Sequence, residues 1–184
     1  MATDFNYMAV IDKYYPADAG VRGILLHHSR QVAEYALDLA TRNSLDLDPG
    51  EIETAAMLHD IGIIFTDADG ILCRGTEPYL RHGIIGAELL RKEGASEIYA
   101  SVAERHTGAG LTAEDVVRLN LPLPHDRDYM PRTTLERLIC YADCFYSKTG
   151  AMERKSLETV RGKMLRHGED ILARFDALHA EFGE

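Results

Sequence analysis

The sequence predicts an all-α protein that folds as a single domain. Apolar residues recur every three or four positions along most of the chain, whereas no segment alternates with period two for long enough to predict a sheet. A length of 184 residues suffices for one compact core and is marginal for two. No repeat or Pro/Ser-rich linker marks a domain boundary. We therefore treat residues 1–184 as one domain, with its core at about 20–150 and C-terminal helices at about 153–182.

Three helices are predicted in the first third of the chain. A short helix over residues 5–14 ends before Pro16, and a long helix follows over residues 21–43. The third, over residues 49–61, has Asp48 as its cap and Pro49 in its first turn, and it stops at Gly62. Residues 65–81 then form an irregular loop, long enough to serve as a lid or a pocket wall.

The remainder of the chain is also predicted to be helical. Helices over residues 82–93 and 96–106 are separated by Gly94, and Thr112 caps a short helix that runs to about residue 119. The prolines of residues 119–132 exclude a continuous helix there. A helix over residues 134–147 follows, and residues 153–182 form two helical stretches that break near Gly168.

Composition and charge narrow the classes of partner. Hydrophobic residues make up 46% and charged residues 27%, as in ordinary globular proteins. The net charge of −10 repels phosphate backbones, so neither a nucleic-acid duplex nor an anionic membrane is expected as a partner. A small phosphorylated substrate remains compatible, because a bound metal ion reverses the local field. Without a signal peptide or a span of roughly 20 apolar residues, we expect a cytoplasmic protein, and a homodimer is left open.

Several histidines occupy positions where a helix would carry apolar residues. His28 completes the apolar face that contains Leu25 and Val32, whereas His27 is on the solvent face. The same pattern places other titratable side chains on inward faces, namely His59, His82, His106 and Asp143. Any one of these histidines alone would be read as a core residue with a single hydrogen bond.

Taken together, these side chains predict a metal site. Burying several titratable groups separately costs a few kcal/mol each, whereas a shared divalent ion satisfies them jointly. Imidazole and carboxylate ligands suit Mn, Fe, Co, Ni or Zn, and the absence of thiolates from the set argues against a purely structural zinc.

Three segments resemble the HD-domain superfamily of metal-dependent phosphohydrolases, named for a His-Asp pair. They are HHSRQVAEYALDLA, AAMLHDIGI and LICYADCFYS, in that order, and the second matches the HDIG variant of the motif. The resemblance covers roughly residues 20–150 and implies a helical domain with the metal site at its centre. It implies the metal ligands His28, His59, Asp60 and Asp143, with His59 and Asp60 also catalytic.

Two further segments, RHGIIGAELL and ERHTGAG, resemble the additional histidine segments of two-metal members. By this resemblance His82 and His106 hold a second ion, and Asp60 bridges the two. The alternative is a single metal ion, with these two histidines orienting substrate or water.

One departure from the family pattern concerns the phosphate contact. Many HDIG members have a lysine after the glycine, where this chain has Ile63. Four other cations are candidates for substrate binding, each with an ordinary surface charge as the alternative: Arg74, Arg81, Arg105 and Lys148.

The leading functional hypothesis is phosphoester hydrolysis of a nucleotide or another small phosphorylated metabolite. A divalent ion at this site would lower the pKa of a water molecule and polarise a phosphoryl oxygen. Two alternatives remain open. The same ligands suit a di-iron oxygenase that acts on a small polyol or phosphonate, and an intact site could also belong to a nucleotide-binding sensor.

Overall fold

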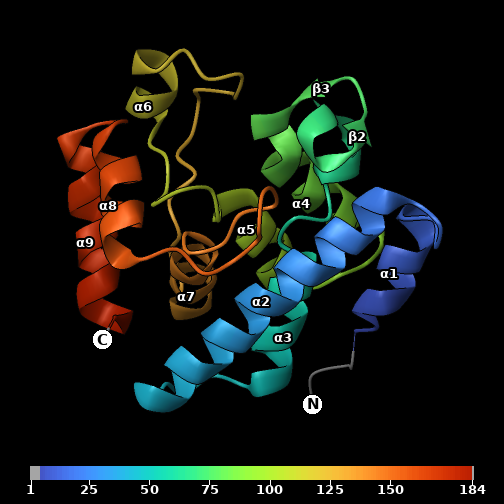
Figure 1. Cartoon of the computed structure of the whole chain (residues 1–184), viewed down its shortest axis with the longest axis horizontal. Coiled ribbons are helices and arrows are strands. Elements are labelled where there is room, and N and C mark those ends of the chain that lie inside the picture. The colour runs from blue at the N-terminus through green and yellow to red at the C-terminus, as the bar shows by residue number, and fades with distance from the viewer. Residues whose placement is uncertain (1–4, 184) are drawn as a thin grey trace.

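The computed structural model describes residues 5–183 and is built almost entirely of helices (Figure 1). The all-α prediction is therefore confirmed. The helices of this part of the chain are α1 (Tyr7–Tyr14), α2 (Gly20–Arg42), α3 (Pro49–Leu58), α4 (His82–Lys92), α5 (Glu97–Arg105), α6 (Ala113–Arg118), α7 (Thr134–Asp143), α8 (Leu157–Leu165) and α9 (Glu169–Phe182).

The core lies between the central helices. Helix α2 packs against α3 and α7, and α5 packs against α3, α4 and α7. The buried stripe of α2 includes Leu25, Val32 and Leu39, each fully buried. Helices α8 and α9 pack against each other, and α9 also packs against α7, which places this pair on one side of the molecule (Figure 1).

Helix starts follow the capping residues in the sequence. The Asp48 carboxylate accepts a hydrogen bond from the Glu51 backbone N–H at 3.0 Å, which fixes the first turn of α3. At α6, Thr112 and Asp115 form a reciprocal capping box. These local contacts explain why the predicted starts of α3 and α6 agree with the structure.

The segment predicted as an irregular loop contains a small three-stranded sheet. Its strands are β1 (Thr66–Ala68), β2 (Cys73–Arg74) and β3 (Glu77–Pro78). The central strand β1 pairs antiparallel with β2 and parallel with β3. The sequence does not predict this sheet, because strands of two or three residues are too short to show an alternating pattern.

Three helix boundaries also differ from the prediction by three residues or more. Helix α3 ends at Leu58, so the His-Asp pair lies in the turn after the helix. Helix α7 ends at Asp143 rather than at residue 147. Helix α8 begins at Leu157 rather than at residue 153, because Ser156 caps it by accepting from the Thr159 backbone N–H.

No helix within residues 5–183 is both long enough and apolar enough to cross a lipid bilayer.

Candidate metal centre

The six side chains predicted as metal ligands lie in two adjacent groups. The first group contains His28, His59, Asp60 and Asp143, and the second contains Asp60, His82 and His106. Within each group, the candidate ligand atoms all lie within 4.8 Å of one another. All six residues are buried except Asp143, which is partly exposed.

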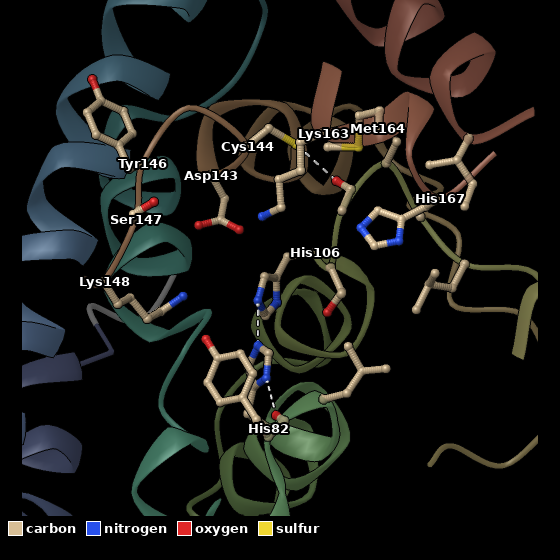
Figure 2. A pocket seen from close by; sticks show the side chains of 18 of the residues that line it. His82, His106, Asp143, Cys144, Tyr146, Ser147, Lys148, Lys163, Met164 and His167 are labelled. Carbon is tan, nitrogen blue, oxygen red and sulfur yellow. Dashed lines mark hydrogen bonds between the residues drawn. The ribbon is translucent and has the colours of Figure 1, made fainter. Parts of the chain in front are cut away.

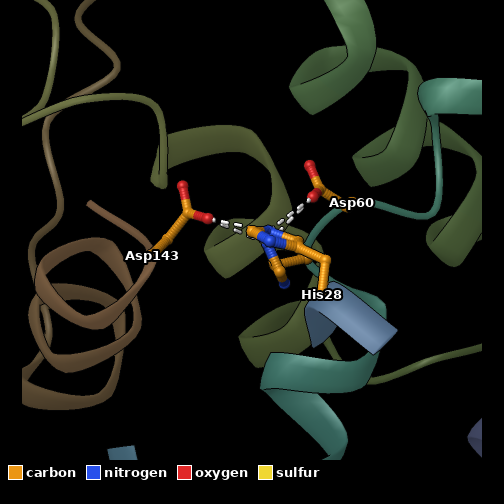
Figure 3. A group of neighbouring side chains, drawn as sticks. His28, Asp60 and Asp143 are labelled. Atoms are coloured by element: carbon orange, nitrogen blue, oxygen red, sulfur yellow. Dashed lines mark hydrogen bonds and ion pairs between the residues drawn. The ribbon is translucent and has the colours of Figure 1, made fainter. Parts of the chain in front are cut away.

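In the first group, two imidazole nitrogens lie between two carboxylates. The His28 Nε2 atom lies 2.9 Å from Asp143 Oδ1 and 3.2 Å from Asp60 Oδ2. Figure 3 shows the His28 ring, carried by α2, between these two side chains. The His59 Nε2 atom lies 3.1 Å from the same Asp60 oxygen. The four residues therefore present nitrogen and oxygen atoms to one common point.

In the second group, the other oxygen of the same aspartate meets two more histidines. Asp60 Oδ1 lies 3.3 Å from His82 Nε2 and 3.4 Å from His106 Nε2. These two nitrogens are 3.0 Å apart, and a dashed line joins them in Figure 2. Asp60 thus presents Oδ2 to the first group and Oδ1 to the second, which is the arrangement expected of a bridging ligand.

Backbone hydrogen bonds orient three of the four imidazole rings. The Nδ1 atoms of His59, His82 and His106 lie 2.6 to 2.8 Å from the carbonyl oxygen three residues earlier in the chain. With Nδ1–H donating to that carbonyl, the Nε2 lone pair faces the site, as metal ligation requires. The buried Nδ1 atom of His28 has no hydrogen-bond partner among the described residues.

Helix ends bring most of these residues together. His59 directly follows α3 and His106 directly follows α5, whereas His82 begins α4 and Asp143 ends α7. At Gly62 the backbone of the turn after α3 closely approaches the backbone of α4. A Cβ atom on Gly62 would lie 2.2 Å from the His82 carbonyl oxygen and 2.6 Å from the Gly86 nitrogen. Gly62 therefore allows α4 to pack directly on the turn that carries the His-Asp pair.

The electrostatics of the site favour bound positive charge. Burial lowers the pKa of His59, but Asp60 and Asp143 outweigh burial and raise this pKa to about 10. Burial raises the pKa of Asp60, but His59 and Lys148 hold it well below its usual range. Burial also lowers the pKa of His106, which favours the neutral form that binds metals.

The donor atoms fit a divalent transition metal. Both carboxylate oxygens of Asp60 and Oδ1 of Asp143 are buried, and among the described residues they meet only the imidazole nitrogens of the site and the ammonium group of Lys148. Such atoms are costly to bury unless a cation satisfies them. The nearby thiols of Cys140 and Cys144 both donate to the Gly108 carbonyl, so the donor set consists of imidazole and carboxylate.

The predicted substrate-binding cations are in different environments. The Lys148 Nζ atom lies 2.6 Å from Asp60 Oδ2, and Lys148 lines a cavity of about 520 Å³ together with His82, His106 and Asp143. Arg81 pairs with Glu77, and Arg105 pairs with Glu136. Arg74 is exposed on β2. None of these three arginines is among the described residues that line the cavity.

Other residues of the cavity wall were not singled out from the sequence. The Tyr79 ring stacks on His82 with centroids 4.8 Å apart, and it precedes that histidine by nearly one helical turn. Lys155, Lys163 and His167 line the same cavity but come from the C-terminal segment. Only Tyr79 had a usable signal, its spacing from His82, because the other three residues are remote in sequence from every motif.

Comparison with known proteins identifies the family of this chain. Residues 25–148 match the HD domain family, and the chain therefore belongs to it. An uncharacterized protein of Methanocaldococcus jannaschii is 35% identical over 65% of this chain and 64% of its own length. A tRNA (cytidine(56)-2'-O)-methyltransferase of Thermoplasma volcanium is 31% identical over 87% of this chain, which spans 42% of that enzyme. The chain thus spans less than two thirds of either curated relative.

Solved structures show a related fold. The HD domain of the L. monocytogenes phosphodiesterase PgpH matches 96% of this chain and 88% of that domain, with a TM-score of 0.55 and 18% identity. The same domain in complex with cyclic-di-AMP matches with a TM-score of 0.53 and 17% identity. At these identities the likeness concerns the fold.

Proposed function

We propose that this protein is a divalent-metal-dependent phosphohydrolase that acts on a nucleotide or another small phosphorylated metabolite. The main support is the position of Asp60, which presents one oxygen to each of two candidate ligand groups beside a cavity. One or two ions of Mn, Fe, Co, Ni or Zn would suit these ligands. Membership of the HD domain family supports the same activity.

Each proposed role follows from the geometry. His28, His59, Asp60 and Asp143 would hold one ion, and His82 and His106 would hold a second ion with Asp60. When bound, the metal lowers the pKa of a water molecule and polarises a phosphoryl oxygen. Asp60 and His59 are the proposed catalytic pair, because they would position the ion that activates the water molecule. Lys148 would donate a hydrogen bond to a phosphoryl oxygen, because its ammonium group lies beside Asp60 on the cavity wall.

One solved structure supports a nucleotide as the substrate class. The PgpH domain complex contains cyclic-di-AMP, a small phosphorylated ligand, which is compatible with a nucleotide substrate here. Methyl transfer is not proposed, because this chain matches less than half of the Thermoplasma volcanium enzyme. The proposed partner is a small phosphorylated molecule, and the protein is proposed to act in the cytoplasm.

The test combines metal content with phosphate release. Protein purified without chelator is analysed for bound metal and assayed on a nucleotide panel with Mn(II), Co(II) or Fe(II). The His59→Ala and Asp60→Ala variants are assayed alongside. The matched control is His27→Ala, because His27 is the exposed neighbour of His28. We expect metal-dependent phosphate release that both site variants lose and the control retains.

Other results would replace the proposal. Two irons per chain with oxygen consumption and no phosphate release would identify the oxygenase instead. Tight nucleotide binding without turnover would identify a sensor. A wild-type protein that binds no divalent metal would overturn the proposed site as a whole.

A further inference from the structure

The wall of the cavity opposite the family motifs comes from the C-terminal segment. Lys163 and Met164 of α8, His167 after it, and Ile171 of α9 all line the cavity. These four residues lie beyond residues 25–148, the part of the chain that matches the HD domain family. The proposed metal ligands and this wall therefore belong to different parts of the chain.

The cavity is more basic than the chain as a whole. The described residues that line it include Lys148, Lys155 and Lys163, with Asp143 as the acidic residue. The whole chain carries a net charge of −10. Clustering of cations in one concave site, on a surface that is otherwise acidic, favours an anionic ligand there.

The three lysines have different partners. Lys148 pairs with Asp60, and the Lys155 Nζ atom donates to the Tyr146 carbonyl oxygen at 2.7 Å. Lys163 forms no hydrogen bond or ion pair with any described residue. In Figure 2 the labelled Lys163 reaches from α8 into the cavity, on the same side as Asp143. Its ammonium group is therefore the one that a ligand can bind without breaking an internal contact.

An apolar surface lies next to this lysine. Met164 is its neighbour in α8, and Leu121 lines the same cavity from the proline-containing segment. Leu111, Leu119 and Ile171 add further apolar side chains to the lining. A cation beside apolar surface can bind an anion that is linked to an organic group of low polarity.

We propose that Lys163 is a substrate-binding residue, which binds an anionic oxygen of the substrate while Leu121 and Met164 contact its organic group. This inference rests on the proposed function, and it assigns specificity to a helix outside the matched family region. The cavity would accordingly prefer a phosphate ester with an apolar or aromatic group over a small hydrophilic phosphate.

The test measures binding separately from turnover. The probes are inorganic phosphate and the 5′-phosphonate analogue of adenosine monophosphate, in which carbon replaces the ester oxygen. The binding of each probe is measured by calorimetry in the presence of Mn(II), and oxygen is excluded from the samples. We expect Lys163→Ala to weaken both probes about tenfold, the loss of roughly one charge-assisted hydrogen bond. Lys163→Arg should retain most of the affinity.

A second variant separates the contribution of apolar contacts to binding affinity from that of the ionic contact. Leu121→Ser should weaken the phosphonate analogue and leave the affinity for inorganic phosphate unchanged. The matched control is Lys92→Ala, because Lys92 is also an exposed helical lysine but does not line the cavity. Thermal melting of every variant confirms that each has folded.

The outcomes distinguish this inference from the proposed function. If Lys163→Ala binds both probes as wild type does, or if wild type binds neither, the inference is overturned. If wild type binds phosphate as tightly as the analogue, the role of Leu121 and Met164 is overturned. If wild type releases no phosphate from any substrate but Lys163→Ala still loses binding, the proposed function fails, and Lys163 remains an anion-binding residue of the cavity. For a hydrolysed substrate, KM should rise in Lys163→Ala with kcat nearly unchanged.

Discussion

The ammonium nitrogen of Lys148 lies 2.6 Å from Oδ2 of Asp60, the carboxylate that the two candidate ligand groups share. Lys148 is remote from the His-Asp pair in sequence and reaches it through the turn that follows α7. Ile63 follows Gly62, so the positive charge beside Asp60 comes from Lys148, in another part of the chain. A cation this close to a metal ligand competes with metal ions for the same carboxylate.

Replacing Lys148 should separate metal affinity from catalysis. In Lys148→Met the competing charge is gone, so divalent metal should bind more tightly than in wild type. Phosphate release should fall by about 10²-fold, because a donor to the phosphoryl group is lost. Metal titration and phosphate assays on the same samples would check both effects. Weaker metal binding in Lys148→Met would contradict this account.

Removing one histidine of the second group should change the number of ions bound. His82→Ala deletes a ligand of the second group only, so bound metal should fall from two ions per chain to one. Asp60→Ala deletes the shared ligand and should lower the affinity at both positions. Elemental analysis after dialysis against buffered metal measures the stoichiometry. A wild-type value of one ion would show that His82 and His106 serve another role.

Gly62→Ala should destabilise the fold, because the added methyl group would meet the backbone of α4. Overpacking of this kind costs about 1–3 kcal/mol in the free energy of unfolding, and a backbone that cannot move aside brings the cost to the upper end. The control is Gly23→Ala, since a Cβ atom at Gly23 has nothing within 4 Å. That substitution should stabilise α2 by about 0.5–1 kcal/mol. Urea unfolding of the two variants checks the contrast, and equal stabilities would refute it.

Asp115→Asn should remove a buried ion pair that joins α6 to α9. Asp115 is 1% exposed and binds the guanidinium groups of Arg118 and Arg174. Burial alone would raise the pKa of Asp115, but hydrogen bonds from Thr112 and from Arg118, together with the charge of Arg174, lower it from 3.8 to about 2. At neutral pH the variant should lose about 2 kcal/mol or more in the free energy of unfolding.

The lowered pKa of Asp115 determines how the stability of the protein depends on pH. As the pH falls, Asp115 becomes protonated in the unfolded chain before it does in the folded protein. The stabilisation of the fold by Asp115 is therefore complete above about pH 4 and is lost as the pH falls toward about 2. The stability difference between wild type and Asp115→Asn should therefore shrink across this interval. Asp38→Asn is the control, because its pair with Arg42 is exposed. A difference independent of pH from 5 to 2 would exclude this origin.

Much of the fold and of the candidate site could be predicted from local patterns. Helix starts were predictable because Asp48 and Thr112 cap through contacts within one turn. The inward position of His28 followed from its neighbours on α2, and the exposed position of His27 agrees. The structure also brings the six predicted ligand residues together. Their role as metal ligands remains a prediction.

The features that could not be predicted depend on contacts between residues that are far apart in the sequence. Strands of two or three residues leave no periodic signal, and their pairing is visible only once β1 lies between β2 and β3. Lys163 is one of several charged residues in α8, so its place in the cavity depends on how α8 packs. The same limit explains why Lys148, rather than one of the arginines, proved to be adjacent to Asp60.

The contact between Gly62 and the start of α4 has a consequence for the spacing of the two ligand groups. The turn that holds His59 and Asp60 touches the helix that holds His82 through main-chain atoms, with no side chain between them. Main-chain atoms cannot change rotamer, so repacking elsewhere in the core leaves this separation in place. The backbone thus sets the distance between the two ligand groups, and the surrounding side chains can vary without altering that distance.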